Sequence, residues 1–329
     1  MKGIIFALAA TQGLGVLAWQ PNPAAAKSRL RAREPPPYPI CSPATNPECI
    51  AGGKYLIPDL ETSDENSKGD KALKTLLKVG THRPPVSWEK EAAGQMPEPC
   101  YRRGVVQDGW KAADFIIYNV TYDSDCDVAP FVICWNKLSP KSVETIAQEI
   151  GRLPATIRQA ASAYMVYGDK DEDNPAYDGF IGAYAEDGLI LGRASGYFPV
   201  ALVHEITHCV DSTLASPDAV HPRSGSAFSQ SSAWKAAVDK DGFAITPHGA
   251  NKSYTEDFGD VGRAVLLDAV FEGGLAAYAK GNTNLTQIDN QLNAFKSVAG
   301  EYYNGKAGGG KCSAGLKFPF PALLTIPKT

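Results

Sequence analysis

Histidine is scarce in this sequence, and cysteines at metal-binding spacing are missing. The chain has five histidines in 329 residues, and its seven cysteines include no C-x-x-C pair, which argues against a cysteine zinc knuckle. Beyond residue 26 no apolar run is long enough to cross a bilayer, and we see no internal repeat. The formal net charge of −4 disfavours nucleic acid or an anionic membrane as the main partner. A globular protein with one large domain or two small ones fits the length.

The N-terminus has the layout of a secretory signal peptide. Lys2 precedes an apolar run from Gly3 to Trp19, and the small residues 24–26 fit an A-x-A cleavage site. We therefore expect residues 1–26 to be removed and the mature protein to be secreted. Three Asn-x-Ser/Thr glycosylation sequons agree with an extracellular surface, and they lie at Asn119, Asn251 and Asn284.

Cysteine usage fits the same compartment, because disulfides are the expected state of thiols outside the cell. All the cysteines follow the signal peptide, and their odd number leaves at least one thiol free or paired with another chain. Their spacing leaves the connectivity open, and the sequence leaves the oligomeric state open as well. We expect Cys209 either in a disulfide, with Cys312 as one possible partner, or in the core.

Composition divides the rest of the chain near Cys100. Residues 27–99 start basic and continue proline-rich, which is typical of an extended leader and leaves room for a pro-segment. Two short helices are expected within this part, at "DKALKTLLKVG" and "SWEKEAAGQM". Residues 100–329 are then expected to form the compact domain.

The expected domain has strands early and helices late. "DFIIYNVTY" and "FVICWN" have strand composition, and "FIGAYAEDGLILGR" has the pattern of a hairpin that turns at residues 186–188. "SVETIAQEIGRLPATIRQAASAYMVYG" has helical periodicity that is broken at Pro154. A polar loop over 216–253 precedes two further helices, 254–280 and 285–302. This order predicts an α+β fold.

The segment "VHEITHCVD", residues 203–211, concentrates side chains that bind metals. On a helix, His204 and His208 lie four residues apart and share one face, so both can reach one ion. Glu205 lies beside them, where it can polarise a metal-bound water rather than bind the metal itself. The alternative interpretation is a solvated helix face with an incidental pair of histidines.

A catalytic zinc site needs a third protein ligand and one position for water. Asp211 follows on the same helix, but it lies about 10 Å along the axis from His204, so we expect it to orient His208 instead. Glu256 is the second candidate, on the helix "SYTEDFGDVGRAVLLDAVF". Asp260 is expected to accept a hydrogen bond from a ligating histidine. Alternatively, the acids at this helix start are there only for the helix dipole.

These motifs resemble the gluzincin pattern of zinc metallopeptidases. H-E-x-x-H is followed, 48 residues after His208, by E-x-x-x-D, and "EDFGD" is similar to the E-x-F-A-E segment of the lethal-factor-like branch. The resemblance covers about residue 180 to residue 271. It implies a zincin-like fold, in which the edge strand of a small mixed sheet, "FIGAYAEDGLILG", packs on the HExxH helix and holds the substrate. The branch has an oxyanion-stabilising tyrosine where this chain has Gly249, and His248 or Tyr254 is the expected substitute.

A second resemblance covers more of the chain. "YNVTYDSDC", "PFVICWNK" and "EIGRLPATIRQ" are similar to the fungal secreted proteins grouped with conidiation-specific protein 13. This resemblance implies a fungal extracellular protein linked to sporulation or to the host surface, and it says little about substrate.

Together these features predict a secreted zinc-dependent metallopeptidase that acts on a peptide or protein. Zn²⁺ is expected on His204, His208 and Glu256. Glu205 would be the general base for the zinc-activated water and would then pass the proton to the leaving amine. The alternative is a non-catalytic zinc-binding, cell-wall or spore-associated protein. It would need the ligands but not Glu205, and the departure at Gly249 favours it.

Overall fold

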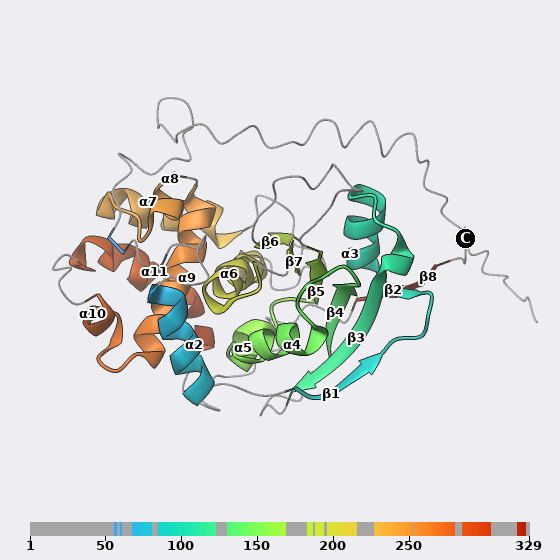
Figure 1. Cartoon of the computed structure of the whole chain (residues 1–329). Coiled ribbons are helices and arrows are strands. Elements are labelled where there is room, and N and C mark those ends of the chain that lie inside the picture. Colours follow the sequence, from blue (N-terminus) through green and yellow to red (C-terminus); the bar gives the residue numbers. More distant parts are fainter. Residues whose placement is uncertain are drawn as a thin grey trace, which may run out of the picture. The chain divides into compact units, whose positions relative to one another are not determined.

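A small mixed sheet forms the centre of the computed structural model, with six strands paired within the described residues (Figure 1). Strand order is β1-β3-β4-β5-β7-β6, where β4–β5 and β5–β7 are parallel and the other neighbours are antiparallel. The strands are β1 (Pro85–Lys90), β3 (Phe115–Tyr122), β4 (Phe131–Asn136), β5 (Ala163–Tyr167), β6 (Ala183–Glu186) and β7 (Leu189–Arg193). A second sheet pairs β2 (Gln95–Pro97) with β8 (Leu323–Thr325). The expected α+β class with a small mixed sheet is confirmed.

The structure describes most of the chain beyond residue 67. The described residues are 56–57, 60, 68–80, 85–122, 130–168, 183–186, 188–193, 196–215, 227–251, 253–279, 285–303 and 321–326. The expected signal peptide and Asn284 lie outside them, and of Asn251 only the backbone is described. No helix within these ranges combines the length and apolarity that a membrane span requires.

The central strands of the sheet are buried on both faces. In β4, Phe131 and Ile133 face one core, while Val132 and Cys134 face the other. The alternation follows from the two-residue repeat of a strand. All five residues of β5 are buried, as expected for a central strand that is parallel to both neighbours and covered on both faces.

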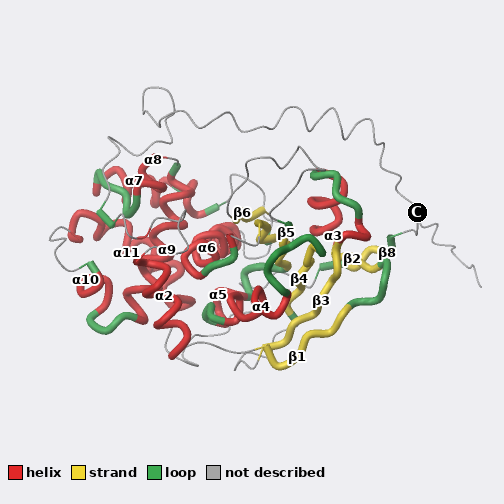
Figure 2. The backbone as a smooth tube through the Cα atoms, in the orientation of Figure 1, coloured by secondary structure: helices red, strands yellow, loops and turns green. Residues whose placement is uncertain are grey.

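Most of the helices lie on one side of the strands (Figure 2). This group consists of α2 (Lys68–Gly80), α4 (Val143–Gly151), α5 (Ala155–Arg158), α6 (Pro199–Ala215), α7 (Ser232–Asp241), α8 (Pro247–Asn251), α9 (Tyr254–Val270), α10 (Gly274–Tyr278) and α11 (Asp289–Ala299). The opposite core is covered by α3 (Glu98–Cys100), which continues as a π-helical segment, Tyr101–Gln107.

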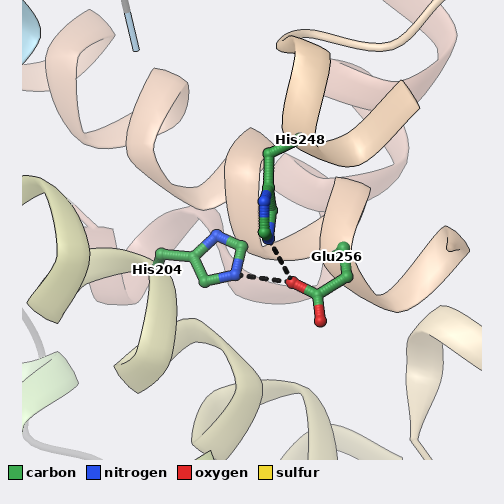
Figure 3. Close-up of side chains that lie close together, drawn as sticks. All are labelled: His204, His248 and Glu256. Carbon is green, nitrogen blue, oxygen red and sulfur yellow. Dashed lines mark hydrogen bonds and ion pairs between the residues drawn. The ribbon is translucent and has the colours of Figure 1, made fainter. Parts of the chain in front are cut away.

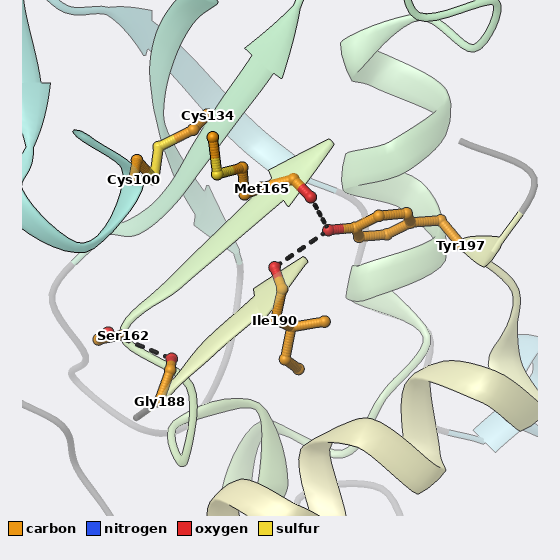
Figure 4. The surroundings of a disulfide bond; sticks show 7 residues. All are labelled: Cys100, Cys134, Ser162, Met165, Gly188, Ile190 and Tyr197. Carbon is orange, nitrogen blue, oxygen red and sulfur yellow. Dashed lines mark hydrogen bonds between the residues drawn. A yellow bond between two sulfur atoms is a disulfide. The ribbon is translucent and has the colours of Figure 1, made fainter. Parts of the chain in front are cut away.

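Helix α6 is anchored to the sheet and to α2. Tyr197, just before α6, places its hydroxyl 2.6 Å from the Met165 carbonyl of β5 and 3.2 Å from the Ile190 carbonyl of β7 (Figure 4). The buried carboxylate of Asp70 accepts a hydrogen bond, 3.3 Å long, from the Val200 amide in the first turn of α6. A carboxylate there satisfies an amide that has no partner within the helix and interacts favourably with the helix dipole.

A disulfide joins Cys100 of α3 to Cys134 of β4 (Figure 4). Both residues lie in the core on the sheet face opposite α6. The bond confirms that cysteines of this chain form disulfides. Cys209 of α6 is buried in the other core, one of the two locations expected for it.

The compact unit begins before Cys100, which corrects the boundary expected from composition. Helix α2 places Leu73 and Leu77 in the main core, and β1 pairs with β3. The Ile57 amide bonds to the Ile245 carbonyl at 2.7 Å. Composition misplaced the boundary because α2 buries its apolar side against, and β1 forms backbone hydrogen bonds with, elements that lie far away in the sequence.

Three local expectations are also corrected. "SWEKEAAGQM" forms β1, a turn with a positive φ of 87° at Gly94, and the start of β2 instead of a helix. "AYMVY" forms β5 rather than the end of a helix, and 216–253 contains α7 and α8. The helix expected over 254–280 is divided into α9 and α10 by two glycines with positive φ, Gly273 and Gly274.

Candidate metal centre

Helices α6 and α9 approach each other closely where two glycines face the histidine-bearing helix. A Cβ added to Gly259 would come within 2.6 Å of Cε1 of His204. Gly262, about one turn further along, lies against Thr207 in a similar way. The absence of side chains at these positions lets α9 lie against α6 with its polar residues beside the histidines.

Three of the expected ligand atoms converge between these helices. Nε2 of His204 lies 2.9 Å from Oε2 of Glu256. Nε2 of His208 lies 3.0 Å from Nε2 of His204 and 3.6 Å from the same Glu256 oxygen. Two donors bound tetrahedrally to one zinc at 2.0–2.1 Å are separated by about 3.3 Å. The observed separations bracket this value, so the donor types and their spacing fit a zinc ion.

A fourth donor reaches the same point from α8. Nε2 of His248 lies 2.9 Å from Oε2 of Glu256, the oxygen that also contacts His204 (Figure 3). The ligand atoms of His204, His248 and Glu256 all lie within 4.8 Å of one another. Two sets of three donors are therefore present, and both include His204 and Glu256.

Asp260 supports the cluster with both of its carboxylate oxygens. Oδ1 lies 2.7 Å from Nδ1 of His204 and accepts a hydrogen bond from Arg263. Oδ2 accepts hydrogen bonds from the Gly249 amide, at 2.9 Å, and from the Thr246 hydroxyl, so it holds the first turn of α8. Burial raises the pKa of Asp260, but Arg263 and His204 outweigh burial and hold this pKa below its usual range.

Positive charge balances the carboxylates of the cluster. Burial lowers the pKa of His204, but its contacts with Asp260 and Glu256 outweigh burial and raise this pKa from 6.5 to about 10. Burial also works against the Glu256 carboxylate, whose pKa the surrounding histidines nevertheless hold well below its usual range. The two carboxylates therefore stay ionised.

Glu205 lies next to these donors on α6 and is 9% exposed. Burial raises the pKa of Glu205, an effect that the neighbouring His204 and His208 reduce and the Glu256 carboxylate reinforces. A carboxylate with a raised pKa beside a cluster of donors fits the role of a proton acceptor.

Two residues expected at the site have their hydrogen-bond partners elsewhere. Asp211 accepts a 2.7 Å hydrogen bond from the Ser229 amide, and Nδ1 of His208 has no hydrogen-bond partner among the described residues. No described hydrogen bond joins Asp211 to His208, so the orienting role expected of Asp211 stays a prediction. The hydroxyl of Tyr254 donates to Asp239 of α7 at 2.7 Å and is engaged there rather than at the cluster.

The glycosylation sites stay predictions. Asn119 lies in β3 between β1 and β4, and its side-chain amide donates to Glu91. The side chain of Asn251 and the whole of Asn284 lie outside the described residues.

Sequence reasoning missed the residues that hold α8. Thr246 and Gly249 lie within residues 216–253, which were expected to form a polar loop. The pair Thr246-Pro247 could have predicted a helix start, because proline is favoured at the first helical position. Arg263 could have been recognised as the partner of Asp260 from its spacing of three residues on a helix.

Fold and site together define an α+β protein with a histidine–carboxylate donor cluster where two helices meet. The chain belongs to the family of conidiation-specific protein Con-13, whose model matches residues 72–312. Conidiation-specific protein 13 of Neurospora crassa is 27% identical to this chain over 188 residues. That match covers 54% of this chain and 48% of the relative, so the chain spans about half the length of the curated relative it matches. No solved structure matches the chain.

The resemblance to conidiation-specific protein 13 inferred from three sequence segments is thus confirmed. The family match starts within α2, before Cys100, in agreement with the packing of α2 into the main core. Neither the family description nor the relative's name mentions an enzyme or a metal, so a functional assignment depends on the chemistry of the site.

Proposed function

We propose that this protein is a secreted zinc-dependent metallopeptidase with a zincin-like fold. The observation that supports it best is the convergence of His204, His208 and Glu256 at separations that suit one zinc ion. Two histidines and a glutamate are a donor set of catalytic zinc sites, and Glu205 supplies the glutamate of the H-E-x-x-H motif. Bound zinc would act as a Lewis acid that polarises a peptide carbonyl and acidifies water.

Glu205 is the proposed general base. Its carboxylate would accept a proton from the attacking water and return it to the leaving amine. The burial that raises the pKa of Glu205 gives this carboxylate a higher proton affinity than an exposed one has. Asp260 contacts His204 through Nδ1, which would leave Nε2 available to bind the ion.

Strand β6 is the proposed binding site for an extended peptide. It is the terminal strand of the described sheet and lies next to α6 (Figure 1). A strand at a sheet edge can hold a peptide through backbone hydrogen bonds. The substrate would then be an exposed, extended segment of a peptide or protein, met outside the cell after removal of the signal peptide.

A non-catalytic zinc-binding or spore-associated protein is the second candidate, and two observations favour it. His248 brings a fourth donor to the cluster, and four protein ligands are typical of structural zinc sites. Tyr254, one of the two residues considered for oxyanion stabilisation, is engaged with Asp239. Such a protein would need the zinc ligands, but its zinc binding would not depend on Glu205.

Peptide cleavage by the wild-type protein and by Glu205→Gln separates the two candidates. Each purified protein would be loaded with zinc, its metal content measured, and its action on a diverse peptide library followed by mass spectrometry. We expect equal zinc contents and cleavage that falls by at least about 100-fold in the variant. Zinc in both proteins without cleavage by either would favour the second candidate, and no zinc in either would refute the metal centre.

A further inference from the structure

We infer that His248 is a fourth protein ligand, which makes the centre a closed site of three histidines and one glutamate when no substrate is present. This deepens the function proposed above and rests on the zinc centre proposed there. Access of water or a substrate to the ion then requires His248 to leave. His248 would thus regulate the site from within the same chain.

His248 approaches the same Glu256 oxygen as the other two histidines. All three direct Nε2 to one oxygen of Glu256, at 2.9 Å from His204, 3.6 Å from His208 and 2.9 Å from His248. The ring centroids of His204 and His248 are 5.2 Å apart, and those of His204 and His208 are 4.6 Å apart, both edge to face. Three nitrogens and one oxygen are as many donors as a tetrahedral zinc takes, and the ligand atoms of His204, His248 and Glu256 lie within 4.8 Å of one another.

The turn that carries His248 is fixed by the same carboxylate that supports His204. Oδ2 of Asp260 accepts from the Gly249 amide and the Thr246 hydroxyl, while Oδ1 contacts Nδ1 of His204. A Cβ added to Gly249 would come within 2.9 Å of the α9 backbone, so α8 lies tightly on α9. One buried carboxylate therefore positions two of the four donors. This shared support argues that His248 is part of the metal site.

His248 is also the ligand best able to leave. Its side chain is 26% exposed, compared with 2% for His204 and 15% for His208. Helix α8 has five residues, whereas α6, which carries the other two histidines, has seventeen. His204 and His208 are fixed on a long buried helix, whereas His248 is on a short helix with a side chain that is partly exposed and can change its rotamer.

Cobalt substitution tests this inference, because the visible spectrum of bound Co²⁺ reports its coordination. The wild-type protein and His248→Ala would be loaded with Co²⁺ and titrated with azide, a small anion that binds an open metal position. We expect azide to change the spectrum of His248→Ala and to leave that of the wild type unchanged at the same concentrations. We also expect His248→Ala to bind Co²⁺ at least about tenfold more weakly, since it has lost a ligand.

Three outcomes would decide the matter. An equal azide response in the wild type and His248→Ala would overturn the fourth ligand and leave the zinc centre in place. No stoichiometric Co²⁺ or Zn²⁺ binding by the wild type would overturn both. Retained binding in His204→Ala would also overturn both, because that variant lacks a donor common to the two sets.

Thr246→Val provides a test that removes no donor. The variant keeps the shape of the side chain but loses the hydroxyl that bonds to Asp260, so it loosens the turn that presents His248. We expect the wild-type cobalt spectrum without azide and an azide response at a lower concentration than in the wild type. An azide response equal to that of the wild type would count against the inference, because the loosened turn should release His248 more readily.

Discussion

Replacing Asp260 by asparagine should weaken both the fold and the metal centre. The four groups that contact its two oxygens are the Nδ1 side of His204 and hydrogen-bond donors from Arg263, Thr246 and Gly249. An asparagine has one oxygen and one NH₂ group. In either orientation, the NH₂ group would replace one carboxylate oxygen and would face the two groups that this oxygen contacts in the wild type. Arg263, which is fully buried, would lose its negative partner. Removing one partner of a buried ion pair costs about 3–5 kcal/mol, and we expect the free energy of unfolding to fall by about that amount.

Urea unfolding followed by circular dichroism would measure the loss. EDTA in the buffer removes any stabilisation by bound metal. Asp268→Asn is the matched control, because Asp268 lies on the same helix and pairs with Lys296 at 2.6 Å with both side chains more than 30% exposed. An exposed pair of this kind contributes about 0–1 kcal/mol. Equal unfolding midpoints for the two variants would refute the role given to Asp260.

The double variant Asp260→Asn, Arg263→Leu separates charge burial from ligand positioning. Without a buried guanidinium the penalty of an unpaired charge disappears, so part of the lost stability should return. Zinc affinity should stay about 10–100-fold below that of the wild type, because His204 still lacks its anionic partner. Recovery of full zinc affinity would show that Asp260 acts only by neutralising Arg263.

Three further predictions follow from neighbouring contacts. In Gly259→Ala, the new Cβ would lie 2.6 Å from Cε1 of His204, so a competition titration should show zinc affinity lowered at least about tenfold in a folded protein; unchanged affinity would contradict the packing. Burial raises the pKa of Asp211 from 3.8 to about 6, so its contribution to stability is complete below about pH 4 and is lost as the pH rises through about 6. Relative to Asp211→Asn, the wild type in EDTA should therefore lose on the order of 2–3 kcal/mol of unfolding free energy between pH 4 and pH 7, and parallel pH curves would exclude this. Reduction of the bond between Cys100 and Cys134 should lower the free energy of unfolding by about 2–4 kcal/mol without changing zinc affinity, because this disulfide lies on the sheet face opposite α6; a coupled loss of affinity would contradict that separation.

Local periodicity predicted the parts of the site that lie within single helices. His204 and His208 share a face because a helix places residues four apart side by side. Glu256 and Asp260 have the same spacing on α9, and the choice of Glu256 as a ligand also used the resemblance to the gluzincin pattern. The runs that form β3 and β4 were likewise identified, because aromatic and β-branched residues dominate them. What these elements have in common is that a short window of sequence contains the whole signal.

Contacts between distant segments account for what the sequence did not predict. The sequence pattern predicts that the segment "AYMVY" is part of a helix. It is a strand instead, because it pairs with β4 on one side and β7 on the other. His248 was considered for oxyanion stabilisation rather than as a ligand, because no spacing relates residue 248 to residue 204. Their proximity depends on the two oxygens of Asp260 and on the close contact of Gly249 with α9.

The packing of α2 bears on how access to the metal centre could be controlled. Asp70 caps the first turn of α6 through the Val200 amide, and Leu73 and Leu77 lie in the main core. Proteolytic removal of all of residues 27–99 would uncap the helix that carries His204 and expose that core. Activation by loss of such a pro-segment therefore conflicts with the fold, and so does cleavage immediately before α2, because Leu56, Ile57 and Leu60 also lie in the main core. A switch that keeps α2 in place has to act at the donors themselves, as the movement proposed for the α8 histidine would.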